Sequence, residues 1–273
     1  MLLVVASVAW GAYALIGSAG GGSGPTTQVL PPPPKPLKIV FPEGFTRREM
    51  AQRITAVDAI AVHKRGVHPH LSAKKYLAAT QASMLPATFA HDHKRRTLEG
   101  FLFPATYDFA AQTTSSQLVK SQLAAFRSNW AKLDLTYAKS KHLTPFDVLT
   151  IAAMVEKETL APDERGLVAA VIYNRLHAHM PLGIDATIRY GLNVPGTQSL
   201  RQSELANPTP YNTRLYPGLP PGPIANPGLA SMQAAAHPAK VDYLYFVRKP
   251  DKVHHFFTKS FTAFQNYANA HGY

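Results

Sequence analysis

The chain has 273 residues, of which 46% are hydrophobic and 16% are charged, so it is long enough to bury a sizeable core. Its net charge of +12 favours an anionic partner, which leaves a membrane surface, an acidic cell-wall polymer or a nucleic acid as candidates. The basic residues are scattered and form no recognition motif, which argues against nucleic acid, and the absence of cysteine excludes disulfides and thiolate metal sites.

The first 17 residues, MLLVVASVAWGAYALIG, contain no charged side chain, and we interpret them as a single membrane-spanning anchor. As a helix they would span roughly 25 Å, slightly less than the hydrocarbon core of a bilayer. A cleaved signal peptide is one alternative, because residues 17–20 are small enough to suit a cleavage site. A buried helix of a soluble domain is the other alternative.

Residues 18–37 are rich in glycine, serine and proline, which predicts a linker that is flexible at first and then stiff. We expect the folded domain to occupy residues 38–273. It should open with a short strand, a turn and a helix that begins at a capping box formed by Thr46 and Glu49. The aromatic stretch at 98–109, LEGFLFPATYDF, predicts core packing, with a share of it lining a groove as the alternative.

The stretch LTPFDVLTIAAMVEKETL carries a helix start signal, with Thr144 as N-cap, Pro145 at the first helical position and Asp147 completing a capping box. When the residues are turned by about 100° each, Glu158 falls near the centre of the main apolar stripe. Glu156 falls between the two apolar stripes of the same helix. Glu158 is therefore the carboxylate that interrupts the buried face.

The position of Glu158 has a chemical consequence. A carboxylate in apolar surroundings resists ionisation, and Pro162 places Glu158 in the last helical turn, where the helix dipole disfavours an anion. Both effects keep the group protonated near neutral pH, which is what a general acid requires. The alternative is a structural glutamate that pairs with a buried arginine, for which Arg175 and Arg189 are candidates.

Two helices are predicted to follow this one. Residues 162–176 indicate an amphipathic helix whose last turns carry Asn174. The stretch LGIDATIRYGL then carries Asp185 and Tyr190. Asp185 either belongs to the functional site or is the N-cap of a helix that stops at Gly191.

Residues 210–228 form a long loop that several prolines stiffen, and long loops inside compact domains are usually functional. Tyr211 and Tyr216 offer stacking surfaces, whereas Asn212 and Thr213 offer hydrogen-bonding groups. This set of side chains suits a sugar ligand. The stretches VDYLYFVRK and HHFFTKSF, which follow the loop, predict two aromatic strands.

Several motifs in this order resemble the MltG/YceG family of membrane-anchored endolytic murein transglycosylases: AAMVEKET, VIYNRL, LGIDATIRYG, YNTRLYPGLPPGPIANPG, AAAHPA, YLYFV and HHFFTKS. The resemblance runs from about Val40 to the C-terminus and is densest over residues 151–260. It implies cleavage of the MurNAc–GlcNAc β-1,4 bond of nascent glycan strands, which leaves 1,6-anhydro-MurNAc ends. The catalytic glutamate of the family falls on Glu158, and the pair Glu158–Thr159 is similar to the Glu-Ser pair of lysozyme-like lytic transglycosylases.

From the residues and the resemblance together, we predict an α+β catalytic domain with a lysozyme-like catalytic helix and short strands, preceded by one transmembrane helix. We predict Glu158 as the catalytic residue. The predicted substrate-binding residues are Thr159, Asn174, Asp185, Tyr190, Tyr211, Asn212, Thr213 and His255.

No metal or organic cofactor is expected, because the histidines at 63–70 fit no ligand pattern and the reaction needs none. The expected partners are peptidoglycan strands and cell-wall synthesis proteins, with the catalytic domain on the extracytoplasmic side of the plasma membrane. The LysM-like module that the family usually carries before its catalytic domain has no counterpart in the linker. The alternative functions are a muramidase that hydrolyses with Glu158 and Asp185, and a non-catalytic wall-binding or division scaffold.

Overall fold

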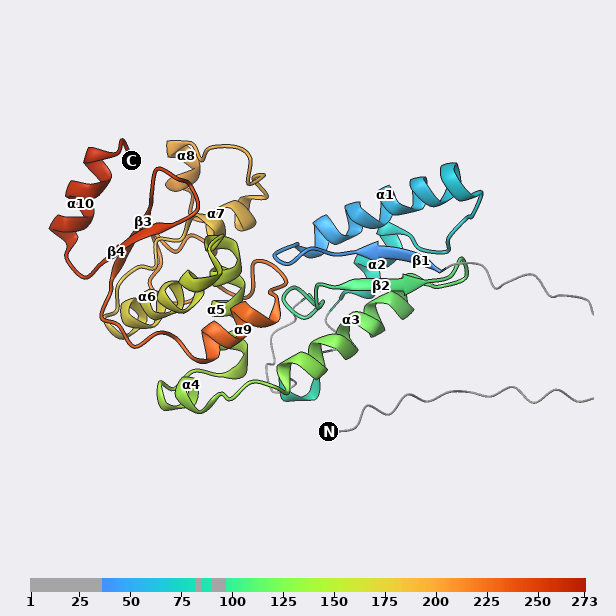
Figure 1. Cartoon of the computed structure of the whole chain (residues 1–273), viewed down its shortest axis with the longest axis horizontal. Helices are drawn as coiled ribbons and strands as arrows, with labels where there is room; N and C mark the ends of the chain where they lie inside the picture. The colour runs from blue at the N-terminus through green and yellow to red at the C-terminus, as the bar shows by residue number, and fades with distance from the viewer. Residues whose placement is uncertain (1–35, 82–84, 90–96) are drawn as a thin grey trace, which may run out of the picture. The chain divides into compact units, whose positions relative to one another are not determined.

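Strand β1 (Leu37–Val40) pairs antiparallel with β2 (Thr106–Phe109), with Leu37 opposite Phe109. Figure 1 shows this sheet in a computed structural model that describes residues 36–81, 85–89 and 97–273. Within these residues, Pro36–Tyr273 form one compact unit. The predicted anchor at 1–17 and nearly all of the predicted linker lie outside the described residues. Among the residues that are described, no helix is both long and apolar enough to cross a membrane.

The N-terminal sheet is covered by helices that pack against one another as well as on the strands (Figure 1). These helices are α1 (Arg47–Arg65), α2 (Ala73–Ala79) and α3 (Ser115–Trp130), whereas the short 3₁₀ helix η2 (Ala87–Phe89) packs against α5. The predicted capping box at the start of α1 is confirmed, because Thr46 and Glu49 exchange side-chain and backbone hydrogen bonds.

The rest of the chain is mainly helical, with one further two-stranded sheet in which β3 pairs antiparallel with β4. In chain order the elements are α4 (Thr136–Ser140), α5 (Pro145–Glu158), the 3₁₀ helix η3 (Pro162–Glu164), α6 (Arg165–His177), α7 (Asp185–Leu192), α8 (Gln202–Leu205), α9 (Leu229–Ala236), β3 (Tyr245–Arg248), β4 (His255–Thr258) and α10 (Phe261–Ala270). Helices and two small antiparallel sheets in one unit confirm the α+β class for the described residues.

Helix α5 lies at the centre of the unit and packs against α6 and α9 (Figure 1). It begins as predicted, with Pro145 as first residue behind the capping box of Thr144 and Asp147. Every residue from 148 to 155 is buried. The helix ends at Glu158, as predicted from Pro162, so this carboxyl stands where a buried helix reaches solvent.

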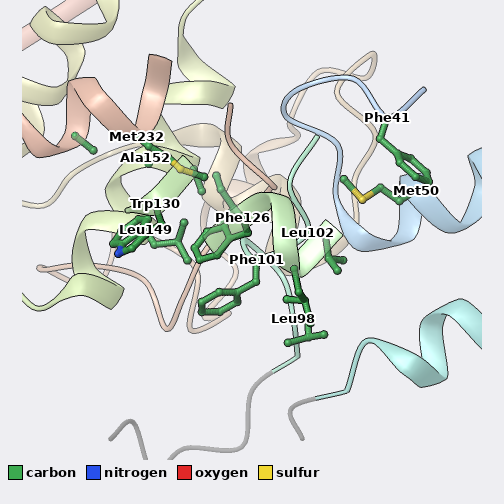
Figure 2. Packing of buried hydrophobic residues seen from close by; sticks show 14 of the residues in the cluster. Phe41, Met50, Leu98, Phe101, Leu102, Phe126, Trp130, Leu149, Ala152 and Met232 are labelled. Carbon is green, nitrogen blue, oxygen red and sulfur yellow. The ribbon is translucent and has the colours of Figure 1, made fainter. Parts of the chain in front are cut away.

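The aromatic stretch at 98–109 contributes to the same core, as predicted. Figure 2 shows Phe101 beside Phe126, and the two ring centroids are 5.2 Å apart at a steep angle. Leu98 and Leu102 are also fully buried. Glu99, one of the two charged residues of this stretch, faces a cleft, so the groove-lining alternative also holds for part of it.

Asn226, in the proline-rich loop, joins three segments that are far apart in sequence. Its Oδ1 accepts hydrogen bonds from the N–H groups of Gly100 and Leu102, at 2.9 and 3.0 Å. Its Nδ2 donates to the carbonyl of Phe45 and to Glu99 Oε1, both at 2.8 Å. The side chain is fully buried and fully used, so the loop has a fixed position beside the residues that form the site.

Candidate active site

Glu158 lies half-buried in a cleft of about 660 Å³, which we call the Glu158 cleft. The end of α5 forms its base, and α7 supplies one wall with Asp185, Arg189 and Tyr190. The start of α1, Arg248 of β3, residues 193–196 after α7 and Ile224 also line it. The cleft therefore assembles side chains from four elements around one carboxyl group.

The surroundings raise the pKa of Glu158 to about 7. Burial is the main cause, and the negative charge of Asp185 adds to it. Arg248, a hydrogen bond from the Ala186 N–H and Arg189 act in the opposite direction, because they favour the anion. The carboxyl is thus near the midpoint of its titration at neutral pH, as the sequence predicted from its apolar surroundings.

The alternative role of Glu158, as the partner of a buried arginine, fails for Arg175. That guanidinium donates to the carbonyls of Leu244, Pro181 and Leu182 instead. Arg189 lines the cleft and influences Glu158 electrostatically, but it donates its hydrogen bonds to the carbonyls of the loop that follows α7. Within the described part of the chain, no lysine or arginine forms an ion pair with Glu158.

The second glutamate of α5, Glu156, has a different environment. Its Oε2 accepts a hydrogen bond from the backbone N–H of Gly228, the N-cap residue of α9. Its negative charge also helps burial to raise the pKa of Glu43. Glu156 therefore holds the start of a packed helix and does not line the Glu158 cleft.

Asp185 shares the cleft with Glu158, as predicted, but it is not a helix N-cap. The N-cap of α7 is Ile184, and Asp185 is the first helical residue. Its Oδ1 instead accepts two hydrogen bonds from Arg214, at 2.8 Å from Nε and 2.7 Å from Nη2. The same alternative placed the helix stop at Gly191, which is also wrong. Helix α7 extends to Leu192, and its C-cap is Asn193, whose φ is +57°.

Tyr190 is the third predicted residue that reaches the Glu158 cleft. Its hydroxyl donates a hydrogen bond of 3.2 Å to Glu99 Oε2, and its ring also lines a neighbouring cleft. Glu99 is only 5% exposed, and burial raises its pKa to about 7. The sequence reasoning missed Glu99, although an acidic residue at the start of an aromatic run was a usable signal.

Four of the other predicted substrate-binding residues are buried and bind the protein itself: Thr159, Asn212, Thr213 and His255. The Thr159 hydroxyl donates to the carbonyl of Val155. Asn212 donates through Nδ2 to the carbonyls of Leu205 and Asn207. These interactions leave Thr159 and Asn212 outside the cleft.

Thr213 is likewise buried, and it fixes the start of α7. Its Oγ1 accepts a hydrogen bond of 3.0 Å from the Ile184 N–H and lies 3.0 Å from the hydroxyl of Thr187. Asn174 uses both of its amide hydrogens on the carbonyls of Val241 and Tyr243, away from Glu158. The structure therefore corrects the placement of both side chains, which hold backbone segments and do not face the Glu158 cleft.

His255 is buried beside Glu164, with 2.6 Å between Nδ1 and Oε2, and its backbone N–H donates to Oε1 of the same carboxylate. It does not reach the cleft. Its position matters for Arg248, however, since the β3–β4 register places these two residues opposite each other. The anchored hairpin thus carries Arg248, which the sequence reasoning also missed, to the Glu158 cleft.

Tyr211 lies against Tyr190, with ring centroids 5.0 Å apart and an edge-to-face angle of 60°, and it lines the neighbouring cleft. Tyr216, the other tyrosine of the loop, is 47% exposed and lines neither cleft. Of the nine predicted site residues, the Glu158 cleft therefore contains Glu158, Asp185 and Tyr190.

The chain is similar in sequence to a known protein family and to two named proteins. The sequence matches the profile of the YceG-like family over residues 18–270. It is 34% identical to the endolytic murein transglycosylase of Streptococcus pneumoniae strain R6 over 247 residues, which cover 84% of this chain and 42% of that protein. Against the Bacillus subtilis protein of the same name, identity is 37% over 217 residues, which cover 78% of this chain and 59% of that protein. The chain thus spans about half the length of these relatives.

A solved structure is similar as well. The 2.6 Å crystal structure of a yceG-like protein from Listeria monocytogenes aligns with a TM-score of 0.71 at 30% identity. The alignment covers 85% of this chain and 76% of that one.

Proposed function

We propose, since this chain belongs to the YceG-like family, that it is an endolytic lytic transglycosylase of peptidoglycan. It would cleave the MurNAc–GlcNAc β-1,4 bond within nascent glycan strands and leave 1,6-anhydro-MurNAc ends. The observation that carries the proposal is a half-buried carboxyl, Glu158, whose pKa of about 7 suits it to both donate and accept a proton in an open cleft. The name of its relatives supports the same activity.

The reaction needs one carboxyl group in two successive roles. Protonated Glu158 donates its proton to the glycosidic oxygen, the C1–O bond breaks, and positive charge develops at MurNAc C1. The anionic Glu158 then accepts the proton of the C6 hydroxyl of the same sugar as that oxygen bonds to C1. The nucleophile is part of the substrate, so its effective concentration replaces that of a positioned water.

The neighbours of Glu158 fit this double role. The hydrogen bond from the Ala186 N–H and the charges of Arg248 and Arg189 stabilise the anion that forms when the proton leaves. Burial and Asp185 stabilise the protonated form. Burial and Asp185 outweigh the groups that favour the anion, and the resulting pKa of about 7 makes both protonation states accessible near neutral pH.

The hydrolytic alternative assigns a second carboxylate to Asp185. Its hydrogen bond and ion pair with Arg214 support an orienting role instead, because they hold the carboxylate in one position. A non-catalytic scaffold would be favoured by a blocked cleft or a fully exposed Glu158, and the described residues have neither feature. The lytic reaction is therefore our conclusion.

We also propose the topology that the sequence predicts: an anchor at residues 1–17, a tether at 18–37 and a catalytic domain at 38–273 on the extracytoplasmic side of the plasma membrane. This arrangement would hold the Glu158 cleft near nascent strands and near cell-wall synthesis proteins. Membrane fractionation tests it. Full-length protein that is released by high salt, or that is cleaved near residue 20, would rule out the anchor.

Mass spectrometry of the products from purified uncross-linked glycan strands tests the activity. Internal cleavage with anhydro ends is the expected result, and Glu158→Gln should lose at least about 10²-fold in rate. Reducing ends would instead identify a hydrolase. If the folded parent chain yields no cleavage, the scaffold alternative would replace the enzyme.

A further inference from the structure

A second cleft of about 430 Å³ adjoins the Glu158 cleft, and we call it the Glu99 cleft. The two clefts share Arg48 and Tyr190. Because one side chain from α1 and one from α7 lie on both linings, a polymer bound across Glu158 meets the Glu99 cleft next. The mechanism described above uses no group from this second cleft.

The rim of the Glu99 cleft is held rigidly by close packing at Gly100. Residues 221–223, Pro-Gly-Pro, form this rim. Gly100 has a φ of +89°, and a Cβ there would lie 2.6 Å from the ring of Pro223. The N–H of Gly100 is also bound by Asn226. Such a cleft is formed before any ligand arrives, which lowers the entropic cost of binding.

A second close approach positions the aromatic wall. A Cβ on Gly191 would lie 2.6 Å from Thr209 Oγ1 and 2.8 Å from Tyr211 Cβ, so only glycine lets this segment pack on α7. The packing holds the edge-to-face pair of Tyr190 and Tyr211 in the cleft. Paired tyrosines offer an apolar face together with polar edges, a combination that suits the mixed surface of a sugar ring.

Glu99 provides a directed polar group at the base of this cleft. Oε1 accepts hydrogen bonds from the Arg47 N–H at 2.9 Å and from Asn226 Nδ2 at 2.8 Å, whereas among the described residues the Tyr190 hydroxyl alone donates to Oε2. A carboxylate has about four acceptor positions, so one on Oε2 is unused by the described residues. Because only 5% of the Glu99 surface is exposed, the orientation of its side chain is fixed.

We propose that the Glu99 cleft is a further sugar-binding subsite, in which Glu99 hydrogen-bonds a hydroxyl or amide group of the glycan strand beyond the sugars at the scissile bond. The inference rests on the proposed function, since it takes the same strand as the ligand of both clefts. Continuity through Arg48 and Tyr190 is what identifies the occupant. The subsite would add affinity for long strands without touching the reacting atoms.

Steady-state kinetics on uncross-linked glycan strands test the subsite with two independent variants. Glu99→Gln removes the charged acceptor while keeping its shape, and Thr97→Trp fills the cleft from its half-exposed rim. Each should raise KM roughly tenfold, the size of one lost hydrogen bond to a charged group, with kcat within about twofold of the parent. Leu215→Ala, at an exposed position of the same loop outside both clefts, is the matched control and should change neither constant.

A binding experiment separates this inference from the proposed activity. The same strands are titrated by calorimetry into Glu158→Gln and into Glu158→Gln combined with Thr97→Trp, so that no cleavage is needed. Roughly tenfold weaker binding by the double variant supports the subsite even if the parent shows no turnover. Equal binding by both proteins would overturn it, as would a fall in kcat with unchanged KM for both single variants, because that pattern indicates a purely structural role.

Discussion

The backbone N–H of Gly228 donates a hydrogen bond of 3.0 Å to Oε2 of Glu156, only two residues before Glu158. Helix α5 thus directs the Glu156 carboxylate to α9 and the Glu158 carboxyl into the Glu158 cleft. The roles of the two glutamates are separate because a rotation of about 200° along the helix divides them. One is part of the scaffold, whereas the other can react.

Substitution of the two glutamates should therefore have unequal effects. Glu156→Gln keeps an acceptor for Gly228 and should retain cleavage, while Glu156→Ala should lower the free energy of unfolding by about 1 kcal/mol, the usual cost of a lost N-terminal cap. Glu158→Gln should unfold like the parent yet lose at least about 10²-fold in rate. Denaturation curves and turnover on glycan strands measure both quantities. Equal loss of activity from both glutamine variants would contradict the separation.

Asn226→Ala should be among the most destabilising single changes. It would leave the buried N–H groups of Gly100 and Leu102 without this partner, whereas the carbonyl of Phe45 keeps the hydrogen bond from the backbone N–H of residue 226. Each unsatisfied group costs about 1–3 kcal/mol, so we expect a loss of roughly 3 kcal/mol or more in the free energy of unfolding. Urea denaturation measures it, with the exposed Asn266→Ala as control. A difference of less than about 1 kcal/mol between the two variants would show that water replaces the Asn226 contacts.

Local rules were sufficient to predict helix α5 and the half-buried position of Glu158. The start at Pro145 follows from capping chemistry, and the burial of Glu158 follows from the helical period alone. Those rules depend on neighbours within four residues along the chain. The local rules were sufficient because α5 is enclosed on most sides. A polar side chain on its main apolar face is therefore surrounded by other residues.

The positions of the remaining site residues could not be predicted, because they depend on tertiary contacts that sequence spacing does not reveal. Asn212 and Thr213 are polar loop residues, but polarity does not tell whether a side chain meets a ligand or a buried backbone group. Glu99 and Arg248 reach the site from segments far from α5 in sequence. Their placement requires the Asn226 junction and the β3–β4 register, which are tertiary features.

The stability of the protein should fall as the pH rises from about 4.5 to 7. Burial raises the pKa of Glu99 from 4.5 to about 7, so the folded chain binds more protons than the unfolded chain within that window. The penalty is absent below the lower value, grows through the window and is constant above the upper one, reaching on the order of 3 kcal/mol. Glu99→Gln should reduce the slope of unfolding free energy against pH, and part of the slope should remain because the pKa of Glu158 is raised over the same window. A curve parallel to that of the parent would show that Glu99 is not a group whose pKa rises on folding.

The alkaline limb of the activity profile should move in opposite directions in two variants. Glu158 must be protonated to act as an acid, so kcat/KM should fall as the pH rises through about 7. Arg248→Gln removes a charge that lowers the pKa, so the limb should move to higher pH. Asp185→Asn removes a charge that raises it, so the limb should move to lower pH, each by roughly half a unit or more. Shifts of the same sign would show that neither residue acts on Glu158 through its charge.

The products of Asp185→Asn decide between the lytic and the hydrolytic reaction. In the lytic reaction the C6 hydroxyl of the substrate attacks C1, so Asp185 has no proton to take and its carboxylate remains bound to Arg214. Asparagine keeps an oxygen for Arg214, and cleavage should therefore remain measurable with anhydro ends unchanged in mass spectra. A hydrolase would need Asp185 as nucleophile or base. Activity as low as that of Glu158→Gln, together with reducing ends from the parent enzyme, would establish the hydrolase.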